Sequence, residues 1–544
     1  MNTNFKYIVS TEFSKLAATL MDAEKNVYTA PPYAAVLCRK SLEEWIRWLY
    51  ENDADLELPY DTSLNALLHN QDLRDLLAPS VFHQVNLVRK LGNDAVHATI
   101  KIQPEEALHV LKIMHGFTTW VIRVYSEDKL DVPAFDAYLI PQDQPVVKYK
   151  DRIAELEAEF QKAQELLREK DAELTRIQQI KQQHAKIPPP PDPNEKVTRE
   201  LYINLLLREA GWDPSGVDVA EYPVSGMPTG DGKNNGPGFV DYVLWGDDGK
   251  PLAVVEAKRT SRDSRVGANQ AKLYADCLEI MHGQRPVIFY TNGFETYIWD
   301  DTWYAAREIY GFYKKEELEL LIQRRTTRTS ISQAPIDPSI TDRYYQIEAI
   351  RSVANVLENK GREVLLVMAT GTGKTRTAAA LVDLFSKCNW AKRILFLADR
   401  NALIFQAKKA FTNHLPNLPA VDLTKEKDSL HARVVFSTYQ TMINLIDKEY
   451  DGAQRHFGIG HFDVIIFDEI HRSVYNKYKA IFQYFDGYRI GLTATPKAEG
   501  DRDTYHLFGL EPNMPTYAYE LEQGVEDKFL VPPMSVSVPI KEAN

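Results

Sequence analysis

Residues 363–375 read Glu-Val-Leu-Leu-Val-Met-Ala-Thr-Gly-Thr-Gly-Lys-Thr. The apolar run Val364–Met368 is typical of a buried strand, and residues 376–386 have a helical pattern. Gly371 and Gly373 lie between the two, where their backbone freedom lets N–H groups close around phosphate oxygens at the start of a helix. The stretch therefore predicts a phosphate-binding loop, in a variant form because the last residue of the strand stands where the strict motif has glycine.

The residues of this loop have separate expected roles toward ATP. Lys374 is expected to reach the β- and γ-phosphates, and Thr375 is expected to place its hydroxyl on Mg²⁺. The part of the loop that surrounds the phosphates consists of Thr370, Gly371, Thr372 and Gly373. We predict that these six residues bind the nucleotide.

An acidic motif further along the chain supports the same chemistry. Asp468-Glu469-Ile470-His471 follows the apolar run Val464–Phe467, so its carboxylates are expected at the carboxyl edge of a sheet, beside the loop. We predict that Asp468 holds Mg²⁺ through water and that Glu469 orients or deprotonates the attacking water. His471 is expected to couple the nucleotide to the next motif.

The sequence after residue 342 alternates apolar runs with helical patterns, which predicts a parallel α/β sheet. The expected strands are residues 364–368, 394–398, 434–438 and 464–467.

A second constellation of charged residues lies earlier in the chain. Asp241 falls in the expected strand 239–245, and Glu256 and Lys258 close the expected strand 252–257 on one face, because they are two residues apart. We predict that Asp241 and Glu256 hold Mg²⁺ and that Lys258 positions and activates an attacking water. A surface strand pair beside an unrelated turn acid is the simpler alternative, which these three residues alone leave open.

Further residues favour a site at this place. Glu200 lies on the expected preceding helix, residues 198–209, and Gln270 and Tyr274 follow on the next one. A basic cluster suited to phosphates consists of Lys258, Arg259, Arg262 and Arg265. A solvated surface would have the same composition, so the cluster adds weight only beside the acids.

Length and composition limit the class of protein. A chain of 544 residues is too long for one hydrophobic core, and a net charge of −12 argues against a protein that coats DNA non-specifically. No apolar run approaches the roughly 20 residues of a membrane span, and the first thirty residues lack an export signal. The three cysteines lie far apart, which disfavours disulfides or a zinc site. We therefore predict a cytoplasmic protein with no membrane partner.

Seven segments are predicted along the chain. Residues 1–145 are expected to be helical, with apolar stripes in 34–50, 81–91 and 108–117. Residues 146–187 carry a short coiled-coil seam, which we interpret as a helical strut in preference to an intermolecular pairing. The remaining segments are a proline-rich linker (188–196), an α/β domain (197–325), a polar linker (326–341), the parallel α/β domain (342–530) and a further connection (531–544).

Residues 342 to about 530 resemble the first RecA-like lobe of superfamily 2 helicases and translocases. Gln346 is similar to the glutamine that reads adenine in this superfamily. Asp399-Arg400 and Phe436–Gln440 resemble the motifs that touch the nucleic-acid backbone, and Gly491–Pro496 resembles the motif that links hydrolysis to movement. The superfamily has a second lobe that supplies an arginine finger, and we expect this chain to be a fragment that ends before it.

Asp241, Glu256 and Lys258 resemble the active site of PD-(D/E)xK nucleases, although Val240 stands in place of the proline. Gln270 and Tyr274 match the Gln-x-x-x-Tyr element of a subgroup found in restriction and recombination nucleases, which implies that both act in the nuclease site.

Residues 89–97 resemble a segment of helical HEPN-like domains. The spacing from arginine to histidine is longer than in the ribonucleases of that family, so no ribonuclease activity is expected. We predict that Asn93 and His97 make structural hydrogen bonds and that the domain docks a partner.

The order of helical domain, coiled coil, nuclease and helicase lobe resembles the R subunit of type I restriction enzymes over nearly the whole chain. This multidomain α and α/β family implies an ATP- and Mg²⁺-dependent enzyme that translocates double-stranded DNA and cuts unmodified DNA away from the recognition site. It acts with methyltransferase (M) and specificity (S) subunits, and S-adenosylmethionine binds only the M subunit. Two alternatives stay open: a stand-alone helicase-nuclease of DNA repair or phage defence, and a non-catalytic DNA-binding scaffold, which the intact acids and lysines disfavour.

Overall fold

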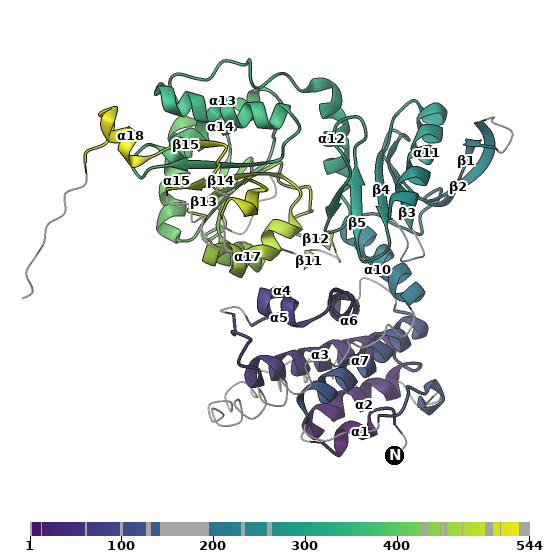
Figure 1. Cartoon of the computed structure of the whole chain (residues 1–544). Coiled ribbons are helices and arrows are strands. Elements are labelled where there is room, and N and C mark those ends of the chain that lie inside the picture. Colours follow the sequence, from purple (N-terminus) through teal and green to yellow (C-terminus); the bar gives the residue numbers. More distant parts are fainter. Residues whose placement is uncertain are drawn as a thin grey trace, which may run out of the picture. The chain divides into compact units, whose positions relative to one another are not determined.

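The computed structural model describes residues 3–11, 13–59, 62–97, 102–126, 132–141, 195–229, 234–257, 264–426, 432–446, 449–450, 454–470, 472–494, 504–511 and 513–532 (Figure 1). The predicted coiled coil, almost all of the proline-rich linker, Lys258 and His471 lie outside the described residues, as do Thr495 and Pro496. The chain forms two compact units, which are Met1–Trp299 with Ala306–Leu318 and Ile443–Gly458, and Asp300–Ala305 with Glu319–Met442 and Ile459–Asn544.

The first unit begins with a helical domain, as the sequence predicts. The three apolar stripes lie in α3 (Pro31–Asn52), α6 (Pro79–His97) and α7 (Pro104–Tyr125), which pack against one another. A capping box between Gln103 and Glu106, followed by Pro104, starts α7. The shorter helices are α1 (Lys6–Val9), α2 (Ala17–Asn26), α4 (Leu64–His69) and α5 (Gln71–Leu76), with 3₁₀ turns at Ser14–Leu16 and Ala137–Leu139.

A six-stranded mixed sheet follows α10 (Glu195–Glu209) in the same unit. Its strands, in spatial order, are β1 (Ala220–Pro228), β2 (Asn234–Trp245), β3 (Pro251–Ala257), β4 (Val287–Thr291), β5 (Thr296–Trp299) and β6 (Arg307–Ile309). All neighbours are antiparallel except β3 and β4. Helix α11 (Ser264–His282) packs on this sheet, and its buried side chains share one apolar core with the strands. The three strands predicted here, β2, β3 and β4, are confirmed.

The second unit contains a parallel α/β sheet of seven strands, which is also the predicted arrangement. The strands in spatial order are β15 (Tyr517–Tyr519), β7 (Glu363–Met368), β14 (Tyr488–Thr493), β13 (Val464–Asp468), β8 (Ile394–Ala398), β10 (Val434–Thr438) and β9 (Ala420–Asp422). The accompanying helices are α13 (Tyr344–Glu358), α14 (Lys374–Lys387), α15 (Asn401–His414), α16 (Tyr439–Ile443), α17 (Arg472–Tyr484) and α18 (Leu521–Glu526). Helix α12 (Lys315–Thr327) spans the boundary between the two units in sequence, and a 3₁₀ turn occupies His506–Phe508.

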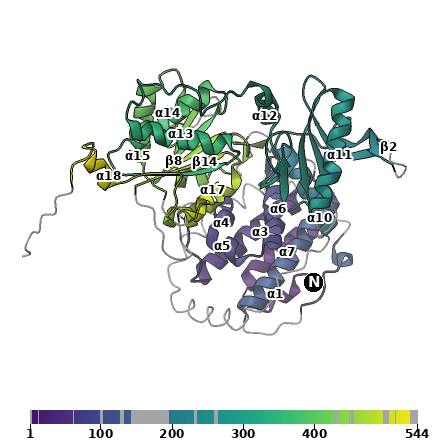
Figure 2. The same cartoon turned by 45° about the horizontal axis from the view of Figure 1, so that its top comes forward.

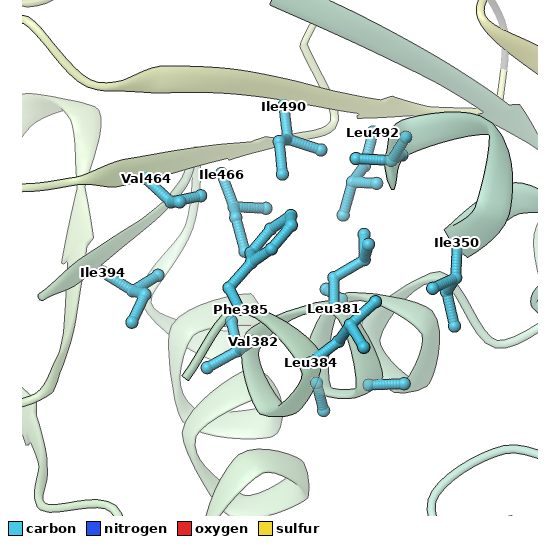
Figure 3. Close-up of a cluster of buried hydrophobic side chains, with 14 of the residues drawn as sticks. Ile350, Leu381, Val382, Leu384, Phe385, Ile394, Val464, Ile466, Ile490 and Leu492 are labelled. Atoms are coloured by element: carbon cyan, nitrogen blue, oxygen red, sulfur yellow. The ribbon is translucent and has the colours of Figure 1, made fainter. Parts of the chain in front are cut away.

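One face of the parallel sheet is covered by α13, α14 and α15, whose apolar side chains form a single core with the strands (Figure 2). Leu381, Val382 and Phe385 of α14 pack toward Val464, Ile466 and the other strand residues labelled in Figure 3. Each such fully buried side chain contributes roughly 1.5–3 kcal/mol through removal of apolar surface from water. This core holds α14, and therefore the loop before it, rigidly against the sheet.

The segment predicted to be a polar linker, residues 326–341, is packed into the second unit. Ile331 and Ile340 are buried in the core of the parallel sheet. The carboxylate of Glu358 accepts the backbone N–H of Ile331 at 2.7 Å, and the guanidinium of Arg351 donates to the carbonyl of Ser332 at 2.7 Å. The segment therefore anchors α13 and is part of the domain that it precedes.

A short antiparallel hairpin, formed by β11 (Glu449–Tyr450) and β12 (Gln454–Arg455), lies in sequence between α16 and β13. Strand β13 and all of α16 except Ile443 belong to the second unit, yet Ile443–Gly458 belongs to the first. Across the described part of the chain, none of the helices has the length and apolarity needed to cross a membrane.

Candidate nucleotide and nuclease sites

The predicted phosphate loop connects β7 to α14 as expected. Gly371 and Gly373 have φ values of 88° and 90°, a region that glycine adopts without the steric cost of a Cβ atom. Thr372 is buried, and its hydroxyl donates to the carbonyl of Ala369 at 2.6 Å, which closes the turn. The loop therefore presents backbone N–H groups at the first turn of α14, the arrangement that binds anions.

Lys374 and Glu469 form an ion pair at this loop, with Nζ and Oε1 3.1 Å apart. The lysine side chain is only 11% exposed, and its ammonium also lies 3.4 Å from the carbonyl of Met368. Glu469 has a φ of 51°, which is uncommon for a residue with a Cβ atom and typical of functional sites. The structure thus brings the predicted phosphate ligand and the predicted water-orienting acid into contact.

Asp468 ends β13 and is buried beside this pair. Burial, together with the adjacent charge of Glu469, raises the pKa of Asp468 to about 6, although Lys374 opposes the shift. A buried carboxylate with a raised pKa is stabilised by a cation, because the positive charge offsets the desolvation of the anion. Thr375 lies half-buried in the first turn of α14, and Thr370 is exposed in the loop.

Gln346 lies directly against the phosphate loop. Its side-chain amide donates to the carbonyl of Thr372 at 2.7 Å, and its carbonyl oxygen accepts a hydrogen bond from Thr341. A Cβ atom on Gly373 would lie 2.5 Å from the Gln346 amide nitrogen, so a larger residue would displace this side chain as well as strain the backbone at a φ of 90°. Tyr345 also donates to the Thr372 carbonyl, at 2.9 Å. The start of α13 is therefore joined to the loop by two side chains, of which the sequence singled out one.

The other predicted motor motifs lie on neighbouring strands. Gly491, Leu492 and Thr493 are in β14, between the strand that leads to the phosphate loop and the strand that ends at Asp468. Tyr439, in the motif 436–440, donates to the backbone carbonyl of Asp468 at 3.3 Å. Tyr478 stacks on Tyr439 and donates to Gln440 at 3.1 Å. Sequence reasoning did not single out Tyr478, because its contacts depend on α17 packing against α16.

In the first unit, the strand register brings the predicted nuclease acids together. Tyr242 pairs with Val255 and Val243 with Val254, so Asp241 lies across from Glu256 on the same face of the sheet. The backbone N–H of Ala257 donates to the Asp241 carboxylate at 2.7 Å. Glu256 is buried, whereas Asp241 is half-exposed, and the pair therefore opens toward solvent on one side.

Gln270 and Tyr274 extend from α11 toward the same acids. The amide of Gln270 donates to the Tyr274 hydroxyl at 2.8 Å, and this hydroxyl is also hydrogen-bonded to the backbone of Phe239. Burial raises the pKa of Tyr274, and the charges of Glu256 and Asp241 raise it further. The two residues predicted from the Gln-x-x-x-Tyr pattern are thus next to the acidic pair.

Gly238 is a residue of this site that sequence reasoning missed. A Cβ atom there would lie 2.9 Å from the ring of Tyr274 and 2.8 Å from the side chain of Met227. The absence of a side chain is what lets the tyrosine reach the strand of Asp241. Its sequence signal was weak, because it is one glycine among several in a loop rich in glycine.

The donor sets fit Mg²⁺, which takes one or two carboxylates, keeps several waters and uses phosphate oxygens of its substrate. The described residues contain no group of three or more His, Cys, Asp and Glu side chains that could hold a metal. Glu200 lies on α10, and its charge, with that of Asp241, contributes after burial to raising the pKa of Tyr242 to about 12. Lys258 and the neighbouring basic residues fall outside the described residues or have no described side chain.

Sequence comparisons agree with this division. A family described as "Type III restriction enzyme, res subunit" matches residues 339–498, and "Type I restriction enzyme R protein N terminus" matches residues 233–307. A domain of unknown function, DUF4145, matches residues 23–173. The first match contains the phosphate loop with Asp468, and the second contains the Asp241–Glu256 pair.

Individual relatives point the same way. The chain is 34% identical over 327 residues to the EcoAI endonuclease subunit of a type I restriction enzyme from Escherichia coli, covering 55% of this chain and 38% of that protein. It is 28% identical over 433 residues to the EcoKI endonuclease subunit of Escherichia coli K12, covering 63% and 36%. The chain is a homologue of type I restriction endonuclease subunits. It spans well under half of the length of these two relatives.

Among solved structures, a fragment assigned as an HsdR subunit of a type I restriction enzyme from Vibrio vulnificus matches 61% of this chain and 61% of its own. The identity is 28% and the TM-score is 0.28. The two restriction-enzyme family matches contain the two candidate sites, and the helical domain before them overlaps a family without an assigned function.

Proposed function

We propose that this chain provides the ATPase motor and the endonuclease of a type I restriction enzyme, that is, an R subunit that translocates double-stranded DNA and cuts unmodified DNA away from the recognition site. One observation carries the proposal: a phosphate loop with its acidic partners and a nuclease-type acidic pair with Gln270 and Tyr274 occur in separate units of one chain. Similarity to type I endonuclease subunits, and family matches over both regions, support it.

In the proposed ATPase, the backbone of residues 370–373 and Lys374 bind the phosphates. Thr375 and Asp468 hold Mg²⁺, which supplies positive charge next to the transferred phosphoryl group. The Lys374–Glu469 ion pair has a further consequence. Phosphate oxygens compete for the ammonium, so nucleotide binding frees the Glu469 carboxylate to orient and accept a proton from the attacking water. Gln346 contributes to the nucleotide site from the loop side.

In the proposed nuclease, Asp241 and Glu256 hold a divalent cation, which stabilises negative charge on the scissile phosphate when bound. Tyr274 and Gln270 keep β2 at the distance from α11 that the acidic pair requires, because the tyrosine hydroxyl is bonded to the strand beside Asp241. Lys258 positions the attacking water in this proposal. No base-reading function is assigned to these residues, since DNA recognition belongs to a separate specificity subunit.

The proposed partners are double-stranded DNA and the M and S subunits of the same system. S-adenosylmethionine acts through the M subunit, and the complex works in the cytoplasm. None of the residues discussed above is required for methyl transfer.

The deciding experiment is co-expression of a form that includes the expected second lobe with candidate M and S subunits of the same system, followed by purification and incubation with ATP, Mg²⁺ and unmodified circular DNA. We expect a stable complex that cuts only unmodified DNA and only with ATP. Cleavage by this protein without M and S would instead support a stand-alone helicase-nuclease. DNA binding without ATP turnover or cleavage in the complete complex would support a scaffold.

A further inference from the structure

A buried cluster of three charged side chains joins distant parts of the first unit. Glu209 is the last residue of α10, Lys90 lies in α6 of the helical domain, and Arg455 lies in β12 of the hairpin. The Glu209 carboxylate accepts a hydrogen bond from Arg455 Nε at 2.9 Å, and Arg455 Nη2 lies 2.7 Å from the same oxygen as an ion pair. The other carboxylate oxygen is bonded to Lys90. Each of these side chains is only 1–2% exposed.

The position of Glu209 explains why two cations surround it. A helix carries partial negative charge at its C-terminal end, so a carboxylate there is unfavourable unless a cation compensates both charges. Removing a carboxylate from water adds a further cost, and only close, hydrogen-bonded cations offset it. Lys90 and Arg455 supply that compensation from two different elements. The end of α10 therefore reaches its buried position only when both elements are in place.

Buried charge clusters of this kind contribute little net stability compared with apolar residues of the same size, but they demand one geometry. The contacts around Arg455 agree with a role in specifying position. Its backbone carbonyl accepts Lys314 Nζ at 2.8 Å, and its guanidinium lies 5.4 Å from the ring centre of Tyr310. The Tyr310 hydroxyl in turn lies 2.8 Å from His69 of the helical domain. Apolar packing alone would not select this register for a two-residue strand.

The helical domain makes two more polar contacts to the same assembly. Asn86 of α6 donates to the hydroxyl of Tyr202 on α10 at 3.2 Å, and Asn65 of α4 donates to the carbonyl of Ile446 at 3.1 Å. The polar residues of α6, near the segment that resembles HEPN-like domains, thus form an interface that is buried against α10. The helical domain, which matches a family of unknown function, therefore packs against other elements of the same chain.

A short path connects the cluster to the candidate nuclease site. Asn204, on α10, accepts a hydrogen bond from the Tyr242 hydroxyl at 3.0 Å. Tyr242 is the neighbour of Asp241 in β2, and Asp241 lies across from Glu256. A shift of α10 at Glu209 would therefore be transmitted along the helix to Asn204, and from there to β2, the strand that carries Asp241.

We propose that Glu209 is a positioning residue, and that the polar face of α6 with Arg455 of the hairpin forms the socket that seats α10 under the nuclease sheet. The catalytic consequence rests on the proposed nuclease function. The hairpin is flanked in sequence by α16 and β13, which carry Tyr439, Gln440 and Asp468 of the proposed motor. The socket for α10 is thus completed by the hairpin, which lies in sequence between two elements of the proposed motor. If the hairpin leaves the socket, α10 loses a contact that fixes it, and the acidic pair on β2 and β3 becomes less rigid.

The test compares hydrogen exchange in the full chain between the wild type, Glu209→Gln and a matched control, Asp247→Asn. Asp247 also pairs with a lysine of this unit, Lys315, but its side chain is 86% exposed. We expect Glu209→Gln to raise exchange rates in residues 195–209 and 454–458 by about 5- to 150-fold, the range of a typical coupling between elements. The control should exchange like the wild type, because an exposed ion pair contributes little.

Cleavage and ATP turnover, measured with the same variants in the complete enzyme, test the functional part. Glu209→Gln should lower Mg²⁺-dependent cleavage while ATP turnover stays at the wild-type level, since the phosphate loop belongs to the other unit. Arg455→Lys keeps the charge and the fold but replaces a two-nitrogen contact with a single ammonium, so it should show the same changes at smaller size.

Wild-type exchange in both variants would overturn the socket, and faster exchange with unchanged cleavage would overturn its role in the nuclease. If the wild-type complex itself failed to cut DNA, the proposed function would fall, while the exchange data would still decide whether the socket exists.

Discussion

In the complete enzyme, with its second lobe and its M and S partners, Asp241→Asn is the substitution that separates the two proposed chemistries most cleanly. Asparagine has the shape of aspartate and can still accept the backbone N–H of Ala257, which now lies 2.7 Å from the carboxylate. The change removes one of the two negative charges that are proposed to hold the metal. It leaves the second unit, with the phosphate loop and Asp468, untouched.

The expected effect on stability is small and its sign is informative. A hydrogen bond to a charged acceptor contributes about 1.5–3 kcal/mol and a neutral one about 1 kcal/mol, so the bond to Ala257 weakens by on the order of 1 kcal/mol. Against this, Asp241 and Glu256 lie across from each other on neighbouring strands. Two carboxylates ~5.5 Å apart repel by ~3 kcal/mol at an effective dielectric constant of about 20, and by less where solvent reaches them. The metal-free variant should therefore be as stable as the wild type or slightly more so.

Function should respond in the opposite direction. Groups one step removed from a metal already change metal affinity by about 10- to 100-fold, and loss of a charged ligand should cost at least that. We expect cleavage to disappear at millimolar Mg²⁺, while ATP turnover and the melting temperature stay at or above wild-type values. The control is Asp247→Asn, the same substitution in the turn that follows β2, which should change nothing. A well-folded Asp241→Asn protein that still cuts DNA, or one that loses ATP turnover together with cleavage, would refute the reasoning.

Three further predictions concern other parts of the chain. In a steady-state phosphate-release assay, Lys374→Met should lower ATP turnover by at least about 10²- to 10³-fold, because the lysine is proposed to stabilise transition-state charge. Lys387→Met, at the exposed end of the same helix, is the control and should leave ATP turnover unchanged. Tyr274→Phe should reduce the cleavage rate several-fold at unchanged ATP turnover. The change removes the hydroxyl that joins Gln270 to the backbone of Phe239 but keeps the ring beside Gly238. Tyr297→Phe on β5 is the control, and equal cleavage rates in the two variants would contradict the role of the hydroxyl. Burial, reinforced by Arg123, lowers the pKa of His115 to about 4 from its ordinary value of 6.5. Between pH 4 and 6.5 the unfolded chain therefore binds a proton at His115 that the folded chain does not. The helical domain should lose up to ~3 kcal/mol of its free energy of unfolding as the pH falls from about 6.5 to 4. In unfolding measurements at different pH values, His115→Gln should reduce this dependence of stability on pH.

Much of the fold follows from local patterns in the sequence. The strands 394–398 and 434–438 lie at their predicted residues, because a run of four or five apolar residues between helical segments has few other solutions in a parallel sheet. The same reasoning placed Asp468 at the end of β13 and the phosphate loop at the end of β7, since parallel strands share one carboxyl edge. Local sequence patterns were sufficient here because each of these strands and the phosphate loop has a recognisable pattern of its own.

Contacts that depend on tertiary pairing could not be predicted in this way. The ion pair between Lys374 and Glu469 leaves the lysine side chain only 11% exposed and involves a left-handed backbone at the acid, and no local pattern in the sequence indicates either feature. The segment 326–341 has the composition of a linker, but Ile331 and Ile340 insert into the core of the parallel sheet. A polar stretch with two isoleucines does not reveal which of its residues will be buried.

The position of the hairpin could not be predicted from the sequence, because its main contact joins residues that are far apart in the chain. Arg455 and Glu209 are 246 residues apart, and neither lies in a motif. Nothing local distinguishes this arginine from an exposed one until α10, α6 and β12 are placed together. The predicted boundary at residue 342 accordingly assigned the hairpin to the motor segment, whereas the folded chain places Ile443–Gly458 in the first unit.

The two candidate sites share an electrostatic logic although they share no residue. Each places two carboxylates close together on the edge or face of a sheet, Asp468 with Glu469 in one and Asp241 with Glu256 in the other. Packing of the surrounding core prevents these acids from moving apart, so their mutual repulsion remains in the metal-free protein. In both proposed sites a divalent cation would relieve that repulsion and supply the charge that a reacting phosphate requires. Phosphate oxygens of the substrate would complete the coordination that two carboxylates leave open. Both proposals therefore depend on rigid positioning of the acids as well as on ligand type, and they assign Gly238, Gln346 and Glu209 to that positioning although none of the three is proposed to bind metal.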